Sequence, residues 1–343
     1  MKVVPTIKIT QDFENMKKVL TRYRKYNINT FQFSVTRNSL EEHIEFINSV
    51  KELYKKLFDD DFNIMLNTPC PKDKIRFEFM GREEEIRVNC HEKIILTNKK
   101  DFICEEDIKC FVVRDSFIGR IPEIAIIGDG DLLIKITEIK TDYMIAYCMN
   151  DAIVKKGKAI ASPQGFLKNT SDDIVLKTLE IIKQVKPEIC VLSYIENKSD
   201  IYNFVQKIKE YAGYTPHIMS KIESKQGVNN TEEIAKNSDS VMIARGCLAV
   251  TVGIEKMTKA QDQSIKICKG CNTDVCVASN ILRSLNNRNW PLRSDICDLA
   301  HMIIGGIKYF VITDGFCMDE RFDKLMYYLK NTYDVYNDST PEV

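Results

Sequence analysis

A lysine and a glutamate two residues apart, Lys221 and Glu223, end a short apolar stretch that has the composition of a β-strand. Side chains at positions i and i+2 of a strand lie on one face, so an ammonium and a carboxylate project together from one strand tip. A second apolar stretch, one helical segment later, ends in Ala244-Arg245-Gly246-Cys247. These tips offer charge to a ligand, although solvated charges at strand ends are also common.

The elements that must position these residues alternate along the chain. We predict strands over Val3–Ile9, Thr30–Ser34, Phe62–Leu66, Glu188–Tyr194, His217–Ile222, Ser240–Arg245, Val275–Ser279 and Tyr309–Thr313. Helical patterns follow them at Asp12–Tyr26, Leu40–Phe58, Asp172–Lys186, Ser199–Tyr211, Thr231–Lys236, Ile254–Lys269, Ile281–Leu285 with Asp295–Ile304, and Asp319–Leu329. Eight such alternations predict an α/β fold, a closed (β/α)8 TIM barrel.

An interruption of different character separates the third strand from its helix. It holds short alternating strands at Ile86–Val88, Lys93–Thr97, Cys110–Val113, Ile124–Ile127, Leu132–Ile136 and Met144–Tyr147. We therefore expect residues 1–77 and 160–343 to form the barrel, and residues 78–159 to form a small inserted all-β domain.

The composition argues against several classes of function. Lys+Arg and Asp+Glu both number 49, so no net charge attracts nucleic acid. We find no signal-peptide pattern and no apolar run of membrane-spanning length, and we expect a cytoplasmic protein without membrane attachment. The 12 cysteines are then reduced thiols. Cys268 and Cys271 form the one Cys-x-x-Cys, which we interpret as helix-end cysteines rather than a zinc site.

Several motifs, in order, resemble the pyruvate kinase family. Lys221-Ile-Glu223 and Ala244-Arg245-Gly246 match its strand-tip motifs, and the inserted domain follows the third strand as it does there. Further matches are Thr6-Ile7, Phe31 to Arg37, Leu66 to Arg76, Lys156-Gly157, Val277 to Leu282, and Pro291 to Ala300.

The resemblance implies roles for residues that the chain retains. In that family a phosphoryl group passes from phosphoenolpyruvate to ADP, which requires cations and a hard divalent metal. Lys221 matches the lysine beside the transferred phosphoryl group, and Glu223 matches a magnesium ligand. The backbone of Ala244, Arg245 and Gly246 matches the loop that holds the substrate carboxylate. Arg76 matches the arginine of a Lys-Ile-Arg motif, and Lys156 matches a basic residue where the insertion ends. Ser279 matches a residue whose hydroxyl lies near the enolate.

The departures from the family pattern concentrate at the chemistry. Cys247 replaces the second magnesium-binding aspartate and offers a soft ligand to a hard ion. Gln32 replaces a phosphate-binding arginine. Potassium ligands become Ser34 and Thr36, and Asn67-Thr68 replaces an Asp-Thr pair whose carboxylate would neutralise potassium. Arg37 stands where that family has a nucleotide-contacting histidine. We expect magnesium binding to be weak or absent and potassium binding to be lost.

Three functions fit these observations. The first is a pyruvate kinase-like pseudoenzyme, a non-catalytic or regulatory subunit that still binds phosphoenolpyruvate or a nucleotide. The second is a divergent active pyruvate kinase. The third is another barrel enzyme that handles phosphoenolpyruvate or pyruvate, such as a metal-dependent lyase, and reuses Glu223 and Arg245. We expect no C-terminal regulatory domain. We expect the chain to associate through residues 291–304, either as a homodimer or with a catalytic pyruvate kinase. Arg293, Asp298 and His301 are expected on the exposed side of this segment.

Overall fold

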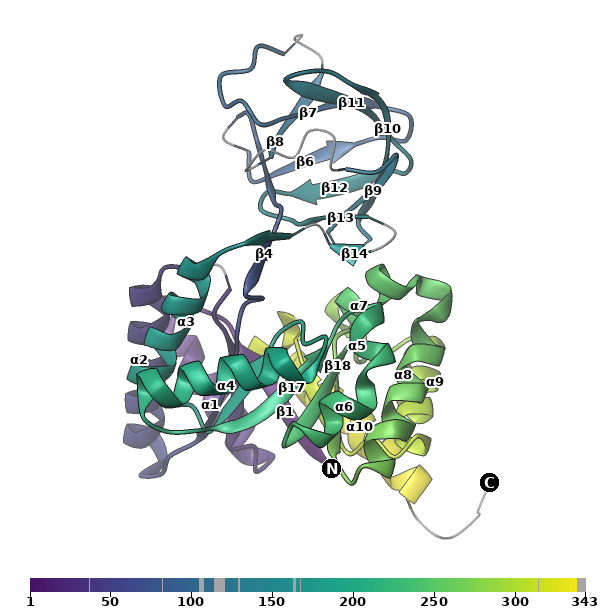
Figure 1. Cartoon of the computed structure of the whole chain (residues 1–343). Coiled ribbons are helices and arrows are strands. Elements are labelled where there is room, and N and C mark those ends of the chain that lie inside the picture. Colours follow the sequence, from purple (N-terminus) through teal and green to yellow (C-terminus); the bar gives the residue numbers. More distant parts are fainter. Residues whose placement is uncertain are drawn as a thin grey trace. The chain divides into compact units, whose positions relative to one another are not determined.

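The computed structural model describes residues 1–36, 38–81, 83–104, 108–113, 121–128, 130–162, 165–166, 168–313 and 315–337, without the side chains of 72, 73, 166 and 168–170. Eight parallel strands close into a barrel, which confirms the predicted fold (Figure 1). The barrel strands are β1 (Lys2–Ile7), β2 (Thr30–Ser34), β3 (Asn63–Asn67), β16 (Ile189–Leu192), β17 (His217–Ile222), β18 (Ser240–Ala244), β19 (Asp274–Ala278) and β20 (Tyr309–Ile312).

The helices follow the barrel strands in chain order. They are α1 (Phe13–Lys25), α2 (Leu40–Phe58), α3 (Asp172–Val185), α4 (Lys198–Ala212), α5 (Lys225–Asn229), α6 (Thr231–Lys236), α7 (Arg245–Val252), α8 (Ile254–Gly270), α9 (Arg293–Ile304) and α10 (Arg321–Asn337), with 3-10 turns η1 (Arg283–Asn286) and η2 (Gly315–Met318). Local sequence sets their ends. Ser39 and Glu42 form a capping box that begins α2, and Gly213, with φ of 77°, ends α4 in the left-handed conformation.

The structure corrects three local predictions. Helix α5 was not predicted; it begins where the Ser224 hydroxyl accepts a hydrogen bond from the Gly227 amide at 3.1 Å. The strand expected to reach Arg245 ends at Ala244, and Arg245 instead begins α7. The helix expected from Ile281 is only the 3-10 turn η1, because Leu282 is left-handed with φ of 51°.

The chain divides into two compact units. The first contains Met1–Cys70, Asp172–Gly246 and the chain from Thr258 onward, and the second contains Pro71–Ser171 with Cys247–Met257. The expected insertion, residues 78–159, lies within the second unit. Its main sheet has the strand order β14-β13-β9-β10-β11-β7-β8-β5, and β12 pairs with β6 and β15 with β4.

The second unit contains one apolar core among its short described strands. These strands are β4 (Lys72–Lys74), β5 (Phe77–Phe79), β6 (Glu85–Val88), β7 (Lys93–Thr97), β8 (Lys109–Val113), β9 (Ile124–Ile127), β10 (Leu132–Ile139), β11 (Tyr143–Cys148), β12 (Ala152–Lys155), β13 (Ile160–Ser162), β14 (Gly165–Phe166) and β15 (Lys168–Thr170). Phe77 and Phe111 stack with ring centroids 5.0 Å apart in this core. Side chains along β10 are alternately buried and exposed, so one face of this strand packs into the core and the other faces solvent.

The barrel of the first unit has an apolar interior. Val4, Met65, Val191, Met219, Met242, Cys276, Ala278 and Val311 form this cluster, and each is at most 3% exposed. Burial raises the pKa of the Cys276 thiol, which keeps it protonated as an apolar side chain. Because strand side chains alternate, residues two positions further along the same strands lie one layer closer to the carboxyl ends of the barrel strands.

Candidate active site

The layer beyond the apolar interior is polar, and it carries several of the predicted residues. Thr6 follows Val4 by two positions, Asn67 follows Met65, Ser193 follows Val191, and Lys221 follows Met219. Side chains two positions apart along a strand share a face, so on four strands the inward-facing side chains change from apolar to polar toward one end of the barrel. Active sites of such barrels lie at the carboxyl ends of the strands, so this layer is the candidate site.

Lys221 and Glu223 form an ion pair at the tip of β17. The distance from Lys221 Nζ to Glu223 Oε1 is 3.2 Å, and the two side chains are 15% and 3% exposed. The other carboxylate oxygen, Oε2, accepts a hydrogen bond from the Tyr194 amide at 2.9 Å. Tyr194 has φ of 62°, so Glu223 also holds a left-handed turn after β16. The pair predicted from sequence is formed, and its carboxylate already has two partners.

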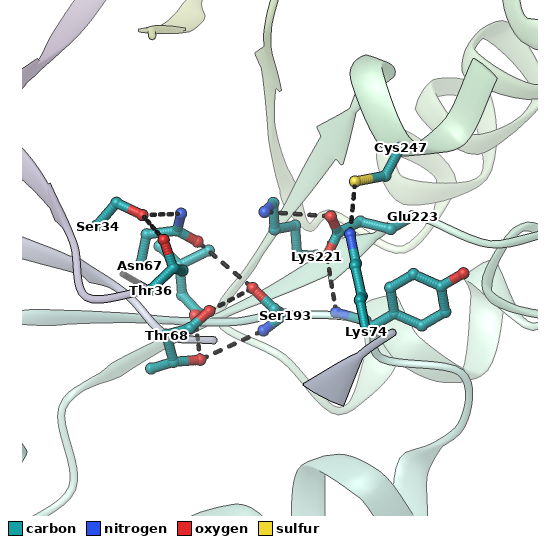
Figure 2. A network of polar contacts seen from close by, with 11 residues as sticks. Ser34, Thr36, Asn67, Thr68, Lys74, Ser193, Lys221, Glu223 and Cys247 are labelled. Atoms are coloured by element: carbon teal, nitrogen blue, oxygen red, sulfur yellow. Dashed lines mark hydrogen bonds and ion pairs between the residues drawn. The ribbon is translucent and has the colours of Figure 1, made fainter. Parts of the chain in front are cut away.

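Hydroxyl and amide groups from β2, β3 and the end of β16 form a second cluster (Figure 2). Asn67 Nδ2 donates to Ser34 Oγ at 3.3 Å, and Ser34 Oγ lies 3.4 Å from Thr36 Oγ1. Ser193 Oγ donates to Asn67 Oδ1 at 3.5 Å and to the Thr68 carbonyl. The residues expected at the potassium position are thus brought together, and they bond to one another.

Gln32 is buried beside Thr6 at the same end of the barrel. It is 2% exposed, and its Nε2 donates to Thr6 Oγ1 at 2.8 Å. Its Oε1 is buried and has no hydrogen-bond partner within the described ranges. A buried acceptor left without a donor costs roughly 1–3 kcal/mol, which marks this atom as a place for a ligand or a water molecule.

Arg245 lies at the junction of β18 and α7 and is held by two residues far away in sequence. Its side chain is 4% exposed, and Nη1 bonds both oxygens of Asp298 at 2.7 Å. Its Nε and Nη2 donate to the Ser279 carbonyl at 3.0 and 2.7 Å. Ser279 has φ of 77°, so Arg245 stabilises a strained turn after β19. The Arg245 guanidinium is thus bound by the protein itself.

The backbone predicted to cradle a carboxylate is the end of β18 and the start of α7. Ala244 is 4% exposed, and a Cβ placed on Gly246 would lie 3.7 Å from Ser279 Oγ, which is ordinary contact. The amides of Arg245 and Gly246 stand in the first turn of an eight-residue helix. Such amides have no partner within the helix and favour an anion.

The other predicted residues belong to the second unit, where each has a partner. Arg76 Nη1 donates to the Gly157 carbonyl at 2.8 Å, and Lys156 forms a close ion pair with Glu84. Lys74 Nζ donates to Cys247 Sγ at 3.2 Å (Figure 2). Arg37 lies outside the described residues. Magnesium would need oxygen ligands, and Cys247 brings a sulfur that contacts an ammonium instead.

Five residues of these arrangements were not predicted as site residues: Thr6, Lys74, Ser193, Tyr194 and Asp298. The spacing of two positions from an apolar strand residue could have indicated Thr6 and Ser193. Asp298 gave no such signal, because it lies on a helix 53 positions from its partner.

The part of the chain that the structure describes contains no helix with the length and hydropathy of a membrane span.

The fold and the polar strand ends define a (β/α)8-barrel protein with a candidate site at the carboxyl end of its barrel. Residues 1–314 match the family model "Pyruvate kinase, barrel domain", and the chain belongs to the pyruvate kinase family. It is 32% identical to a pyruvate kinase of Methanocaldococcus jannaschii over 190 residues, 55% of this chain and 42% of that protein.

Two bacterial relatives match over more of the chain. A pyruvate kinase of Borreliella burgdorferi is 26% identical over 83% of this chain and 58% of its own length. A pyruvate kinase of Thermotoga maritima is 26% identical over 89% of this chain and 64% of its own length. The chain thus spans between two fifths and two thirds of the length of these relatives.

Proposed function

We propose that this chain is a pyruvate kinase-family protein with impaired phosphoryl transfer that acts as a non-catalytic or regulatory subunit. The observation that carries the proposal is Gln32, which stands where the family resemblance implies a phosphate-binding arginine. Its amide is neutral, buried and bonded to Thr6. Phosphoryl transfer depends on cations that stabilise the charge of the phosphoryl oxygens, and a carboxamide cannot supply that charge.

Two further positions support weak cation binding. At the position of the potassium ligands, Asn67 Nδ2 donates to Ser34 Oγ, so a hydrogen-bond donor points at the oxygen that would face the ion. At the position of a magnesium ligand, the Cys247 thiol contacts Lys74. With the family's magnesium absent or weakly held, Lys221 and Glu223 would still orient a bound carboxylate or phosphate. Ligand binding without efficient turnover is therefore the expected behaviour.

A coupled assay of ATP formation tests the proposal. We expect the purified chain, given phosphoenolpyruvate, ADP, magnesium and potassium, to turn over at least about 1,000-fold below the 1–100 s⁻¹ that is usual for kinases. A motif-complete pyruvate kinase in the same assay is the control. Turnover at ordinary rates would instead establish the second candidate, a divergent active pyruvate kinase, which the retained Lys221–Glu223 pair and Ser279 favour.

The loss of potassium binding gives a separate prediction. Exchanging potassium for tetramethylammonium should leave the melting temperature and ligand affinity of the natural chain unchanged, because its amide and hydroxyl cluster is already bonded internally. Asn67→Asp restores a carboxylate beside Ser34 and should make the melting temperature rise with potassium. Asn63→Asp, at the exposed start of β3, is the matched control. A potassium response of equal size in the natural chain and both variants would contradict the assignment.

For the partner, we propose association through residues 291–304, as a homodimer or with a catalytic pyruvate kinase. Ile304 is 69% exposed and Leu292 is 41% exposed, so apolar surface remains at both ends of this segment. Asp298 and His301, expected on the pairing face, have intrachain partners in Arg245 and Asp262. Arg293 and Ile304 are therefore better probes of the surface.

Replacing Ile304 by Asp should lower the mass in solution from that of a dimer to that of a monomer. The charge is unfavourable in a buried apolar contact but harmless at an exposed position. Light scattering after size exclusion measures the mass, and Ile254→Asp, at a 72% exposed isoleucine outside the segment, is the control. If the natural chain is a monomer that retains no pyruvate kinase from its cell extract, the association is excluded.

A further inference from the structure

A basic groove lies on the outside of the barrel, on elements that take no part in the candidate site. It is an open surface hollow of about 440 Å³, lined by Lys17, Lys18, Thr21, Arg22 and Lys25 from α1 and by Asp323 from α10. The α1 residues lie at helical positions i, i+1, i+4, i+5 and i+8, which form one face.

The charge of the groove is unbalanced, although the whole chain is neutral. Four cations line it against one carboxylate, Asp323, which is shared by Arg22 at 3.0 Å and Lys25 at 3.5 Å. Lys17 also contacts Glu14, an 80% exposed carboxylate outside the lining. Within the described ranges, Lys18 forms no ion pair. The lining side chains therefore carry an excess of three positive charges, or two once Glu14 is counted, in a chain with equal numbers of acidic and basic residues.

Asp323 fixes the position of the arginine. Burial favours the neutral form of this carboxyl, but hydrogen bonds from Tyr26 and Arg22 and the charges of Lys25 and Arg22 hold its pKa below the usual value. The Arg22 side chain is only 18% exposed, and it bonds Asp323 through Nε. Within the described ranges, neither Nη group of Arg22 has a hydrogen-bond partner. A fixed guanidinium with free donors is suited to two parallel bonds to a phosphate.

We propose that this groove binds the phosphate group of a small soluble molecule, such as a phosphate monoester or diphosphate. Arg22 would bind two phosphate oxygens, and the flexible ammonium groups of Lys17, Lys18 and Lys25 would neutralise the remaining charge. Thr21 is not a donor here, because its hydroxyl donates to the Lys17 carbonyl at 2.8 Å. The same chemistry would recognise a phospholipid headgroup, but a chain with no net charge is not drawn to an anionic membrane, which favours the soluble ligand.

Calorimetric titration with pyrophosphate and with inorganic phosphate, at constant ionic strength, tests the site. Lys18→Glu should weaken pyrophosphate binding at least about tenfold, because it reverses a charge beside the anion. Arg22→Lys should weaken it to a lesser degree, since the charge stays and the paired donors are lost. Lys207→Glu, an exposed mid-helix lysine on α4 that makes the same charge change, should bind as the natural chain does.

Equal affinities in Lys18→Glu and Lys207→Glu would overturn the proposal, and so would the absence of any heat of binding. Flotation with vesicles of phosphatidic acid in phosphatidylcholine distinguishes the lipid source. We expect no flotation. Vesicle binding that depends on Lys18, without pyrophosphate binding, would also overturn the soluble ligand. Circular dichroism of each variant verifies that the fold is retained.

Discussion

Replacing Asp298 by Asn is expected to lower the free energy of unfolding by about 2 kcal/mol or more. The buried Arg245 guanidinium would lose its ionised partner, and breaking a buried pair from one side typically costs about 3–5 kcal/mol. The Asp298 side chain is 37% exposed, which places this pair at or below the lower end of that range. Urea unfolding followed by circular dichroism measures the difference.

The chain supplies a matched control for this substitution. Asp262 pairs with His301 at 2.9 Å, and both side chains are about half exposed. Asp262→Asn should therefore change stability by no more than about 1 kcal/mol. If the two asparagine variants unfold at the same urea concentration, the Arg245–Asp298 pair does not stabilise the turn at Ser279.

The second large effect is expected from Gln32→Arg. A guanidinium at this position should lower the dissociation constant for phosphoenolpyruvate at least about tenfold, because it adds a charged donor where the amide now has an unpartnered oxygen. Without ligand the variant should be less stable, since a buried cation lacks a partner. Phosphoenolpyruvate should then raise its melting temperature more than that of the natural chain.

Gln32→Met separates this explanation from a simple change of packing. Methionine has a similar volume and gives up the bond to Thr6 without adding charge. It should bind phosphoenolpyruvate no better than the natural chain does. Equal affinities for the arginine and methionine variants would mean that position 32 does not face the phosphoryl group, and the main support for impaired transfer would be lost.

The barrel and the order of its strands can be predicted from the amino-acid sequence. Short apolar, β-branched runs and the helical periodicity of 3.6 are local properties, so all eight barrel strands were located within a few residues of their observed bounds. Side chains also alternate along a strand with a period of 2. The same periodicity placed Lys221 and Glu223 on one strand tip, where they form the ion pair. The match to the pyruvate kinase family was also readable, because its motifs occur in order along the chain.

Which polar atoms already have hydrogen-bond partners within the protein follows from the three-dimensional structure alone. Whether Gln32 bonds Thr6, or Asn67 bonds Ser34, depends on the register of neighbouring strands and on side-chain rotamers. Arg245 meets Asp298 across 53 positions of sequence, and no local pattern encodes such a contact. Sequence spacing identifies which residue types reach the strand ends, whereas the closed barrel fixes their partners, because only ring closure brings distant strands and helices within hydrogen-bonding distance.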